Sequence, residues 1–198
     1  QLLHQPDHQC EAYNQEAIEK LATLINEGNI VAMKGMGGFH LMCDASCDKA
    51  VLELRKRKNR PTKPFAVMFP SIDALFSECK IQEAEQKEII SLLRPIVLLK
   101  RNKRAASISS FIAPHIDRLG VFLPYTPLHV MLFKYLHHPI VATSANCSGE
   151  PIITDARDIV QKLEGVVDFY LDYNRSIVNP SDDSVLQMIG ERRIMMRA

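Results

Sequence analysis

Short apolar segments alternate with amphipathic helical segments along this chain, and this alternation restricts its fold more than any other feature of the sequence. Segments with the character of buried strands lie at residues 30–34, 65–69, 96–99, 120–123, 139–142, 168–172, 184–189 and 192–197. Apolar side chains recur at helical spacing in residues 14–27, 46–58, 82–93 and 128–136. The alternation predicts an α/β fold, with a mixed sheet, helices packed on it and a cleft where strand ends converge.

Polar residues mark the predicted helix starts. Asn14, Ser46, Ser71, Thr126 and Thr154 each precede a helical segment, and each side chain can accept a hydrogen bond from the first turn. We therefore expect these five residues to cap helices.

Composition adds few further limits. The 198 residues are 46% hydrophobic and 24% charged, which is ordinary for a globular domain and excludes a disordered chain. Because no apolar run reaches the roughly 20 residues of a membrane helix and the N-terminus has no signal-peptide pattern, we expect a cytoplasmic protein. The five cysteines are an odd number without C-x-x-C spacing, which favours neither a disulfide scaffold nor a zinc site.

A loop rich in hydrogen-bonding groups follows the strand-like segment 139–142. Residues 143–151, Thr-Ser-Ala-Asn-Cys-Ser-Gly-Glu-Pro, combine hydroxyls, an amide and a glycine that lets a ligand approach the backbone. Plain strand-to-helix turns use the same residue types, so this loop alone leaves both interpretations open. We interpret Cys147 as a small buried residue rather than a nucleophile.

A basic segment upstream favours a functional interpretation of that loop. Residues 55–64 contain six cationic side chains. Arg55 and Lys56 are explained by a solvated helix end, where the helix dipole favours positive charge. Arg60 and Lys63 lie beyond the helix among prolines and have no such explanation. Together with an oxygen-binding loop, these cations predict a phosphorylated ligand.

A glycine-rich turn, Gly35 to Gly38, follows another strand-like segment. Its spacing matches neither the dinucleotide fingerprint nor the P-loop. Either the glycines only make a tight turn, or the flanking Lys34 and His40 face an anionic ligand. Among the seven histidines we expect His40 to act at a site and His129 to be structural.

Two adjacent carboxylates, Asp182 and Asp183, stand at the entry to a strand-like segment. Such a pair can bind the Mg²⁺ that ATP enzymes require, or it can cap a turn. The sequence leaves both interpretations open.

Five motifs narrow the class of protein. They are KGMGGFHLMCDA (34–45), RPTKPFAVM (60–68), GVFLPYTPLH (120–129), VATSANCSGEP (141–151) and IVNPSDDSV (177–185). The chain also contains Lys58-x-Arg60, Ser144-x-Asn146 and Ser148-Gly149-x-Pro151, the signature of YrdC-like domains. Together these motifs resemble the YrdC-like domain of the hydrogenase maturation carbamoyltransferase family HypF, over residues 30–198.

The resemblance implies a YrdC-like α/β fold with a twisted mixed sheet, packed helices and a concave nucleotide-binding cleft. In that family carbamoyl phosphate is hydrolysed to carbamate, and the YrdC-like domain adenylates the carbamate with ATP and releases pyrophosphate. The carbamoyl group then passes to the C-terminal cysteine of the partner protein HypE and becomes a cyanide ligand of nickel–iron hydrogenase. Adenylation needs positioning and cationic stabilisation rather than a protein nucleophile, and the spacing of the residues supports no nucleophilic triad.

The resemblance also implies roles for residues of this chain. It assigns ATP binding to Lys58, Arg60, Lys63, Ser144, Asn146, Ser184 and Arg197, and catalysis to Lys58, Arg60, Lys34 and His40. Lys34 and His40 would face the carbamoyl end. Apart from the resemblance, the adjacent carboxylates of Asp182 and Asp183 are the candidate ligands of Mg²⁺. Residues 1–13 are expected to form a linker, with a zinc-finger remnant near Cys10, and residues 14–198 to form one domain of a larger protein.

Two alternatives stay open. The related synthase that makes threonylcarbamoyl-AMP for tRNA modification has a P-T-E-T-type segment where this chain has residues 34–37, and a histidine where it has Met68. Without those polar groups threonine would be bound less well. The other alternative is a double-stranded RNA-binding module, because the basic clusters 55–63 and 100–104 could follow a phosphate backbone without reading bases.

Overall fold

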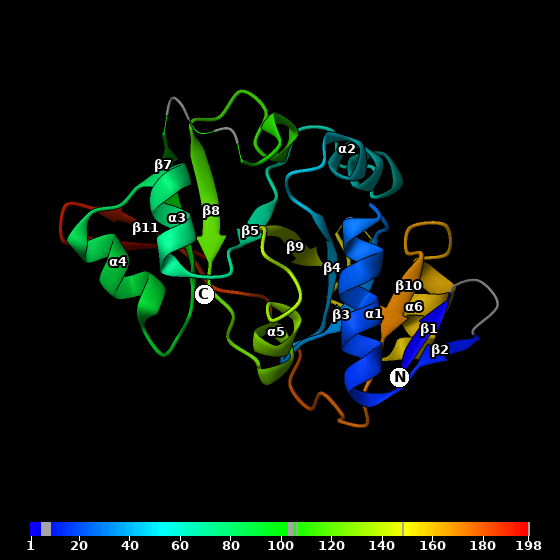
Figure 1. Ribbon diagram of the computed structural model, residues 1–198. Helices are drawn as coiled ribbons and strands as arrows, with labels where there is room; N and C mark the ends of the chain where they lie inside the picture. The colour runs from blue at the N-terminus through cyan, green and yellow to red at the C-terminus, as the bar shows by residue number, and fades with distance from the viewer. Residues whose placement is uncertain (5–8, 103–104, 106, 148, 198) are drawn as a thin grey trace.

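One mixed β-sheet runs through the whole molecule (Figure 1). The structure, a computed structural model, describes residues 1–4, 9–102, 105, 107–147 and 149–197. Within them the strands are β1 (Leu2–His4), β2 (Cys10–Ala12), β3 (Val31–Lys34), β4 (Phe39–Asp44), β5 (Ala66–Met68), β6 (Cys79–Lys80), β7 (Ile96–Arg101), β8 (Arg118–Phe122), β9 (Ile140–Ser144), β10 (Phe169–Leu171), β11 (Val185–Ile189) and β12 (Arg192–Arg197). Their order is β12-β11-β7-β8-β5-β9-β4-β3-β10-β1-β2, with β6 beside β7. Parallel and antiparallel pairs both occur, which confirms the predicted mixed sheet.

Helices cover both faces of this sheet, and an apolar cluster is buried on each. The helices are α1 (Asn14–Asn26), α2 (Asp48–Arg57), α3 (Ile72–Glu78), α4 (Glu83–Ile90), α5 (Pro127–Leu132) and α6 (Ala156–Lys162), with a 3-10 turn at Ser110–Ile112. Side chains alternate along β4: Phe39 and Leu41 join the cluster under α2, α3, α4 and α6, whereas Met42 joins the cluster under α1 and α5. Within the described residues, no helix combines the length and apolar character that a bilayer crossing requires.

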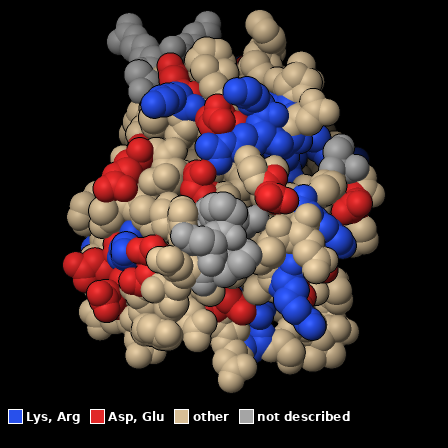
Figure 2. All heavy atoms as spheres, turned by 90° about the vertical axis from the view of Figure 1, so that its right-hand side faces the viewer, with Lys and Arg blue, Asp and Glu red and all other residues tan. Residues whose placement is uncertain are grey.

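Charged side chains of both signs lie on the face of the molecule that Figure 2 shows. On the face shown in Figure 2, Lys and Arg side chains gather in the upper part with Asp and Glu side chains among them. This mixture agrees with a formal net charge of only +1.

The first residues of the chain belong to the sheet, although we expected a linker there. β1 pairs antiparallel with both β10 and β2. The physical reason is apolar burial, because Leu2 and Ala12 pack into the cluster under α1. Cys10 is exposed, and residues 5–8, part of the expected zinc-finger remnant, lie outside the described residues.

The predicted helix caps are only partly correct. Ser71 and Thr126 accept backbone hydrogen bonds at the starts of α3 and α5, as predicted. The other three predicted caps each precede or follow the actual N-cap by one residue: the N-caps are Tyr13, Cys47 and Asp155. Ser46 differs because its backbone N–H and its hydroxyl both donate to the carboxylate of Asp44 instead.

A long connection between β10 and β11 carries Asp182 and Asp183 across the sheet. β10 lies beside β3, whereas β11 lies beside β7, several strands away. On the way, Ser181 N donates to Gly37 O at 3.1 Å. A Cβ on Gly37 would lie 2.2 Å from Ser181 O, so only glycine permits this approach. The glycine-rich turn therefore serves as the anchor of the connection.

Substitution of Gly37 should loosen this anchor. We expect Gly37→Ala to lower the free energy of unfolding by about 1–3 kcal/mol, because the new methyl group displaces the Ser181 backbone. Urea denaturation measures the change. Met36→Ala is the control, since the neighbouring Met36 side chain is 57% exposed and its loss should cost under about 0.5 kcal/mol. Equal stabilities for the two variants would contradict the anchor.

Candidate functional site

A cleft of about 810 Å³ opens on the sheet where several distant segments meet. Its floor is formed by Ala66, Ile96, Leu98, Gly120 and Ala142, from strands β5, β7, β8 and β9. Its walls come from the segment after α2, the loop after β9, the β10–β11 connection and the end of β12. The floor is apolar, and the walls are rich in charge.

Most of the predicted site residues line this cleft. They are His40, Lys58, Arg60, Lys63, Ser144, Asn146, Asp182, Asp183 and Arg197. Lys34 and Ser184 are not among the lining residues. Lys34 Nζ donates to Asp172 Oδ1 at 2.8 Å, and Ser184 O accepts from Ile96 N at 2.8 Å. The structure thus brings the predicted phosphate-binding cations together, whereas Lys34 is engaged in a half-buried ion pair outside the lining.

Lys58 joins the end of α2 to the Ser/Asn loop. Its Nζ donates to the carbonyl oxygens of Ser144 and Asn146 at 2.8 Å each and to Asn146 Oδ1 at 2.9 Å. Ser144 Oγ donates to the same Oδ1 at 3.0 Å. Burial lowers the pKa of Lys58 to about 8, and the positive charge of Arg60 adds to this effect. The basic segment and the loop therefore form one unit, in which the ammonium group of Lys58 is bonded to three oxygen atoms of the loop.

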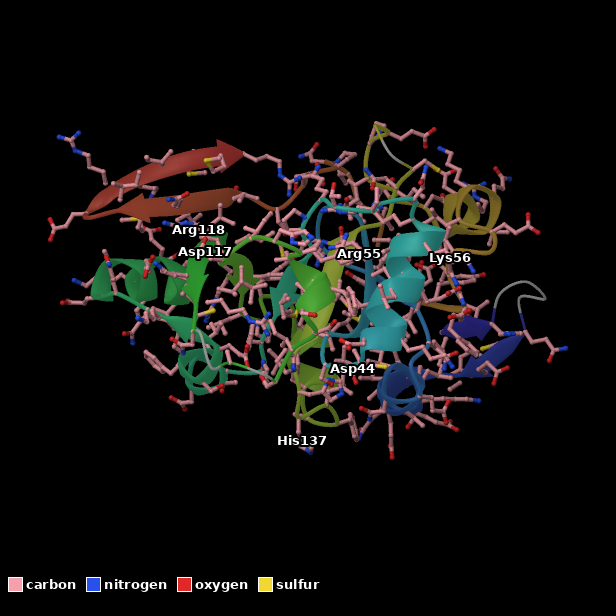
Figure 3. The ribbon with its side chains drawn as sticks, turned by 90° about the horizontal axis from the view of Figure 1, so that it is seen from above. Asp44, Arg55, Lys56, Asp117, Arg118 and His137 are labelled. Carbon is pink, nitrogen blue, oxygen red and sulfur yellow. The ribbon has the colours of Figure 1, made fainter. Side chains whose placement is uncertain are left out.

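Arg55 is buried, so the interpretation of this residue as part of a solvated helix end is wrong. It is 6% exposed, and burial lowers its pKa. Its guanidinium donates to five carbonyl oxygens, those of Arg60, Pro61, Lys63, Phe111 and Ile112. In Figure 3, Arg55 points from α2 toward the interior and its neighbour Lys56 points outward, as the helix-end interpretation predicts for Lys56. Arg55 thereby shapes the segment that forms one wall of the cleft.

Arg60 lies in that wall with much of its side chain out of water. Its guanidinium donates to Lys63 O, Pro64 O and Thr143 Oγ1, and lies 4.9 Å from the ring centroid of Phe65. Burial, followed by repulsion from Arg55, lowers its pKa to about 10. An anion in the cleft would offset this repulsion, so the arrangement favours an anionic ligand. Thr143 is a partner that the sequence analysis did not single out.

The end of β12 closes the cleft against the β10–β11 connection. Arg197 Nε donates to Asp183 O at 2.9 Å, and its Nη1 lies 3.6 Å from Asp182 Oδ2. The predicted nucleotide-site residue Arg197 therefore meets the two predicted magnesium ligands.

A buried polar cluster borders the cleft beside α5. His40 Nε2 lies 3.3 Å from Asp183 Oδ2, and Tyr125 Oη donates to Asp183 Oδ1 at 3.0 Å. The ring of His129 lies 4.8 Å from that of Tyr125 and 6.3 Å from that of His40. Burial lowers the pKa of His129 to about 3, so this ring is neutral. Burial raises the pKa of Asp183, but the hydrogen bond and charge of His40 outweigh it, and the net pKa is lowered.

The carboxylates of Asp182 and Asp183 already have partners in this structure. Asp183 accepts from Tyr125 and meets His40, and Asp182 faces Arg197. Among the described residues there is no group of three or more His, Cys, Asp or Glu side chains placed to hold a metal ion. These side chains do not by themselves build a metal site, and magnesium binding stays a prediction.

The fold and the cleft define a class of protein: an α/β protein whose mixed sheet carries a cationic cleft between α2 and the loop after β9. The model of the Sua5_yciO_yrdC family, described as telomere recombination, matches residues 23–198. The chain belongs to this family.

Within the family the chain is similar to the proteins named HypF. It is 43% identical over 188 residues to the probable carbamoyltransferase HypF of Methanocaldococcus jannaschii, a match that covers 94% of this chain and 24% of that protein. A crystal structure of full-length HypF in the phosphate- and nucleotide-bound form is 39% identical, with a TM-score of 0.92, and the match covers 100% of this chain and 25% of that one. The chain therefore spans about a quarter of the length of these relatives.

A more distant relative has a different name. The threonylcarbamoyl-AMP synthase of Schizosaccharomyces pombe is 28% identical over 185 residues, which cover 79% of this chain and 44% of that protein.

The buried guanidinium of Arg55 yields a test of how the cleft wall is built. We expect Arg55→Met to lower the free energy of unfolding by about 2–4 kcal/mol, because several carbonyl oxygens lose their donor in a poorly hydrated place. Lys56→Met is the matched control: it makes the same change at the next, exposed position. Urea denaturation of both variants measures the difference, and a cost at position 55 no larger than at position 56 would refute this role of Arg55.

Proposed function

We propose that this chain binds ATP in the cleft and adenylates carbamate, forming carbamoyl-AMP and releasing pyrophosphate. One observation carries the proposal: Lys58 is bonded to the Ser144–Asn146 loop beside Arg60, so that cations and oxygen-binding groups meet over an apolar floor. The high similarity to HypF, one of whose structures is nucleotide- and phosphate-bound, supports it.

In this proposal, different parts of the cleft bind the base and the triphosphate of ATP. The apolar floor receives the base, because the faces of a nucleobase gain from contact with apolar side chains. Lys58, Arg60, Lys63 and Arg197 bind the triphosphate, and Ser144 and Asn146, which line the cleft, hold its oxygens. Lys58 exchanges some of its carbonyl acceptors for phosphate oxygens, which are stronger acceptors because they are charged. Magnesium enters with the triphosphate, bound mainly by phosphate oxygens.

The chemistry is a displacement at the α-phosphorus. A carboxylate oxygen of carbamate forms the new O–P bond, the bond from this phosphorus to the bridging oxygen breaks, and pyrophosphate leaves with the electron pair. Charge grows on the equatorial oxygens and on the leaving group, so fixed cations such as Lys58 and Arg60 lower the barrier. No protein nucleophile is needed, since binding aligns the two reactants.

The role of the whole protein follows from the HypF relatives as a further part of the proposal. Carbamate is supplied by hydrolysis of carbamoyl phosphate, and the carbamoyl group passes to the C-terminal cysteine of HypE for cyanide ligand synthesis in hydrogenase maturation. The chain spans about a quarter of those relatives, and we assign these two steps to the parts of such proteins that lie outside the matched quarter.

The other two hypotheses receive less support. A threonylcarbamoyl-AMP synthase needs polar groups for threonine, but Met68 is fully buried in an apolar cluster. RNA binding would need outward cations, whereas Arg55 is buried and Lys58 and Arg60 line the cleft. On the face in Figure 2, acidic side chains interrupt the basic ones. Of the second basic cluster, 103–104 lie outside the described residues. We do not propose RNA binding.

Pyrophosphate release tests the proposed function directly. With ATP, Mg²⁺ and ammonium carbamate, we expect the chain to release pyrophosphate and form an AMP adduct. With threonine and bicarbonate in place of carbamate, we expect little or none, because the contacts for threonine are missing. An enzyme-coupled pyrophosphate assay and mass spectrometry of the adduct measure both. Formation of a threonine-dependent AMP adduct would contradict carbamate adenylation and would support the threonylcarbamoyl-AMP synthase hypothesis instead.

Lys58 should set the pH dependence of ATP binding. In the free protein its pKa is about 8, and a bound triphosphate favours the protonated form and raises that pKa. ATP affinity should therefore be steady below about pH 8 and fall by up to about tenfold per pH unit above it. Calorimetry over this range measures the slope. Lys58→Arg, whose charge persists, should flatten the slope even if affinity drops. An equal slope in both proteins would show that another group titrates.

A further inference from the structure

We propose that Met196 covers the base of the bound nucleotide and that a β-bulge in β12 turns this side chain into the cleft. The inference rests on the proposed function. It adds a residue that recognises the base rather than the triphosphate, on a strand whose arginine is expected to bind the phosphates.

Two consecutive residues of an edge strand line the cleft. They are Met196 and Arg197 of β12, the strand that ends the sheet beside β11. In a regular strand successive side chains point to opposite faces of the sheet, so two neighbours do not both face one cleft. The strand must therefore depart from the regular pattern at this point.

The pairing of β11 with β12 contains this departure. Leu186 of β11 lies opposite Met195. Its neighbour Val185 lies opposite Arg197, which leaves Met196 as an extra residue in β12. β-Bulges of this kind bend the strand and re-aim a side chain, and they are frequent at sheet edges and beside active sites. The bulge accounts for the presence of two successive residues in the lining.

The part of β12 before the bulge faces the other side of the sheet. Met195 lies opposite Leu186, which is buried in the cluster under α2, α3, α4 and α6. Two positions earlier, Arg193 donates to Glu88 Oε1 of α4, from Nε at 3.0 Å and from Nη2 at 2.6 Å. In the described part of the chain, Met195 is not among the residues that line the cleft. The two neighbouring methionines therefore differ in their relation to the cleft.

The apolar floor of the cleft begins next to the bulge. Val185 pairs with Ile96 of β7, and both residues line the cleft. Leu98, two positions along β7, lies on the same face as Ile96 and also lines the cleft. Met196 thus borders a continuous apolar surface that runs from β11 to β7.

Gly120 leaves a hollow in this floor. A Cβ at this position would lie 3.0 Å from Ile96 Cγ2, 3.5 Å from Leu98 Cδ2 and 3.9 Å from the Cα of Ala66. Gly120 is not one of the glycines with a positive φ angle, so its backbone does not require glycine. The missing side chain instead leaves space among apolar groups, where a nucleobase can be bound.

Met196 is free to contact a base in that place. It is 61% exposed although its side chain is apolar. Burial of such a side chain against a ligand is favourable, and the flexible, polarisable thioether adapts well to an aromatic ring. The next residue, Arg197, supplies a positive charge. The bulge therefore places one contact for the base beside one contact for the triphosphate.

NMR of the methionine methyl groups tests this contact without turnover. The chain is labelled with ¹³C at these groups, and Met195→Ala and Met196→Ala assign the two signals. With ATP and Mg²⁺, the Met196 signal should move upfield, because the ring current of a base shields a methyl group that lies over its face. The Met195 signal should move much less. Inorganic tripolyphosphate, which has the charges but no base, should not cause the upfield shift.

The affinities of the methionine variants are the second test, measured by calorimetry. Met196→Ala should bind ATP about three- to tenfold more weakly, because it loses the apolar contact, and should bind tripolyphosphate as the wild-type chain does. Met196→Leu keeps an apolar side chain of similar size and should retain most of the affinity for ATP. Met195→Ala is the matched control and should bind both ligands as the wild-type chain does.

These outcomes separate the inference from the proposed function. A wild-type chain that binds neither ATP nor tripolyphosphate overturns both. Binding of ATP without an upfield shift of the Met196 signal overturns the inference alone, as do equal ATP affinities of Met196→Ala and Met195→Ala. If Met196→Ala weakens ATP and tripolyphosphate equally, Met196 acts on the phosphate contacts, and its role at the base is refuted.

Discussion

The three hydrogen bonds from the ammonium group of Lys58 hold the cleft together. A half-buried ammonium group is costly unless its donors are used, and Lys58 matches its three N–H groups to three oxygens of Ser144 and Asn146. The contact joins the end of α2 to the end of β9, two points that are 86 residues apart for Lys58 and Ser144. Arg55 then fixes the chain just beyond Lys58 through the carbonyl oxygens of Arg60, Pro61 and Lys63, and its two other acceptors tie this segment to residues 111–112. The other parts of the cleft are arranged around this junction.

The cleft is divided electrostatically into two ends. At one end Lys58 and Arg60 keep positive charge in a partly desolvated wall, which burial makes unfavourable without an anion. At the other end His40, Asp183 and Tyr125 form a buried hydrogen-bonded cluster backed by the neutral ring of His129. The adenylation of a small acid that we propose would place a highly charged triphosphate beside a small polar group. The charges of the cleft match this proposed pair of ligands.

Local chemistry explains what could be predicted from the sequence. Strand and helix segments follow from the period of apolar side chains, and the residue types of the Ser/Asn loop and the basic segment favour oxygen ligands wherever they occur. β4 was missed because it is central in the sheet and buried on both faces, so it lacks the polar–apolar alternation of a surface strand. Arg55 was misjudged because its helix position resembles a solvated end, and its carbonyl partners come partly from residues 111–112, far along the chain. Likewise, the adjacency of Asp182 and Asp183 left magnesium binding and turn capping both open, because the Tyr125 contact of Asp183 spans 58 residues and leaves no local signal.

We propose that the triphosphate binds at the junction of Lys58 with the Ser144–Asn146 loop. A crystal structure of this chain with a non-hydrolysable ATP analogue and Mg²⁺ tests this proposal most directly. We expect phosphate oxygens within hydrogen-bond distance of Lys58 Nζ and Arg60, with the base on the floor beside Ala66 and Leu98. A nucleotide bound elsewhere, for example in the groove beside α5 lined by Pro124 and Met131, with the Lys58 junction free of phosphate, would contradict it.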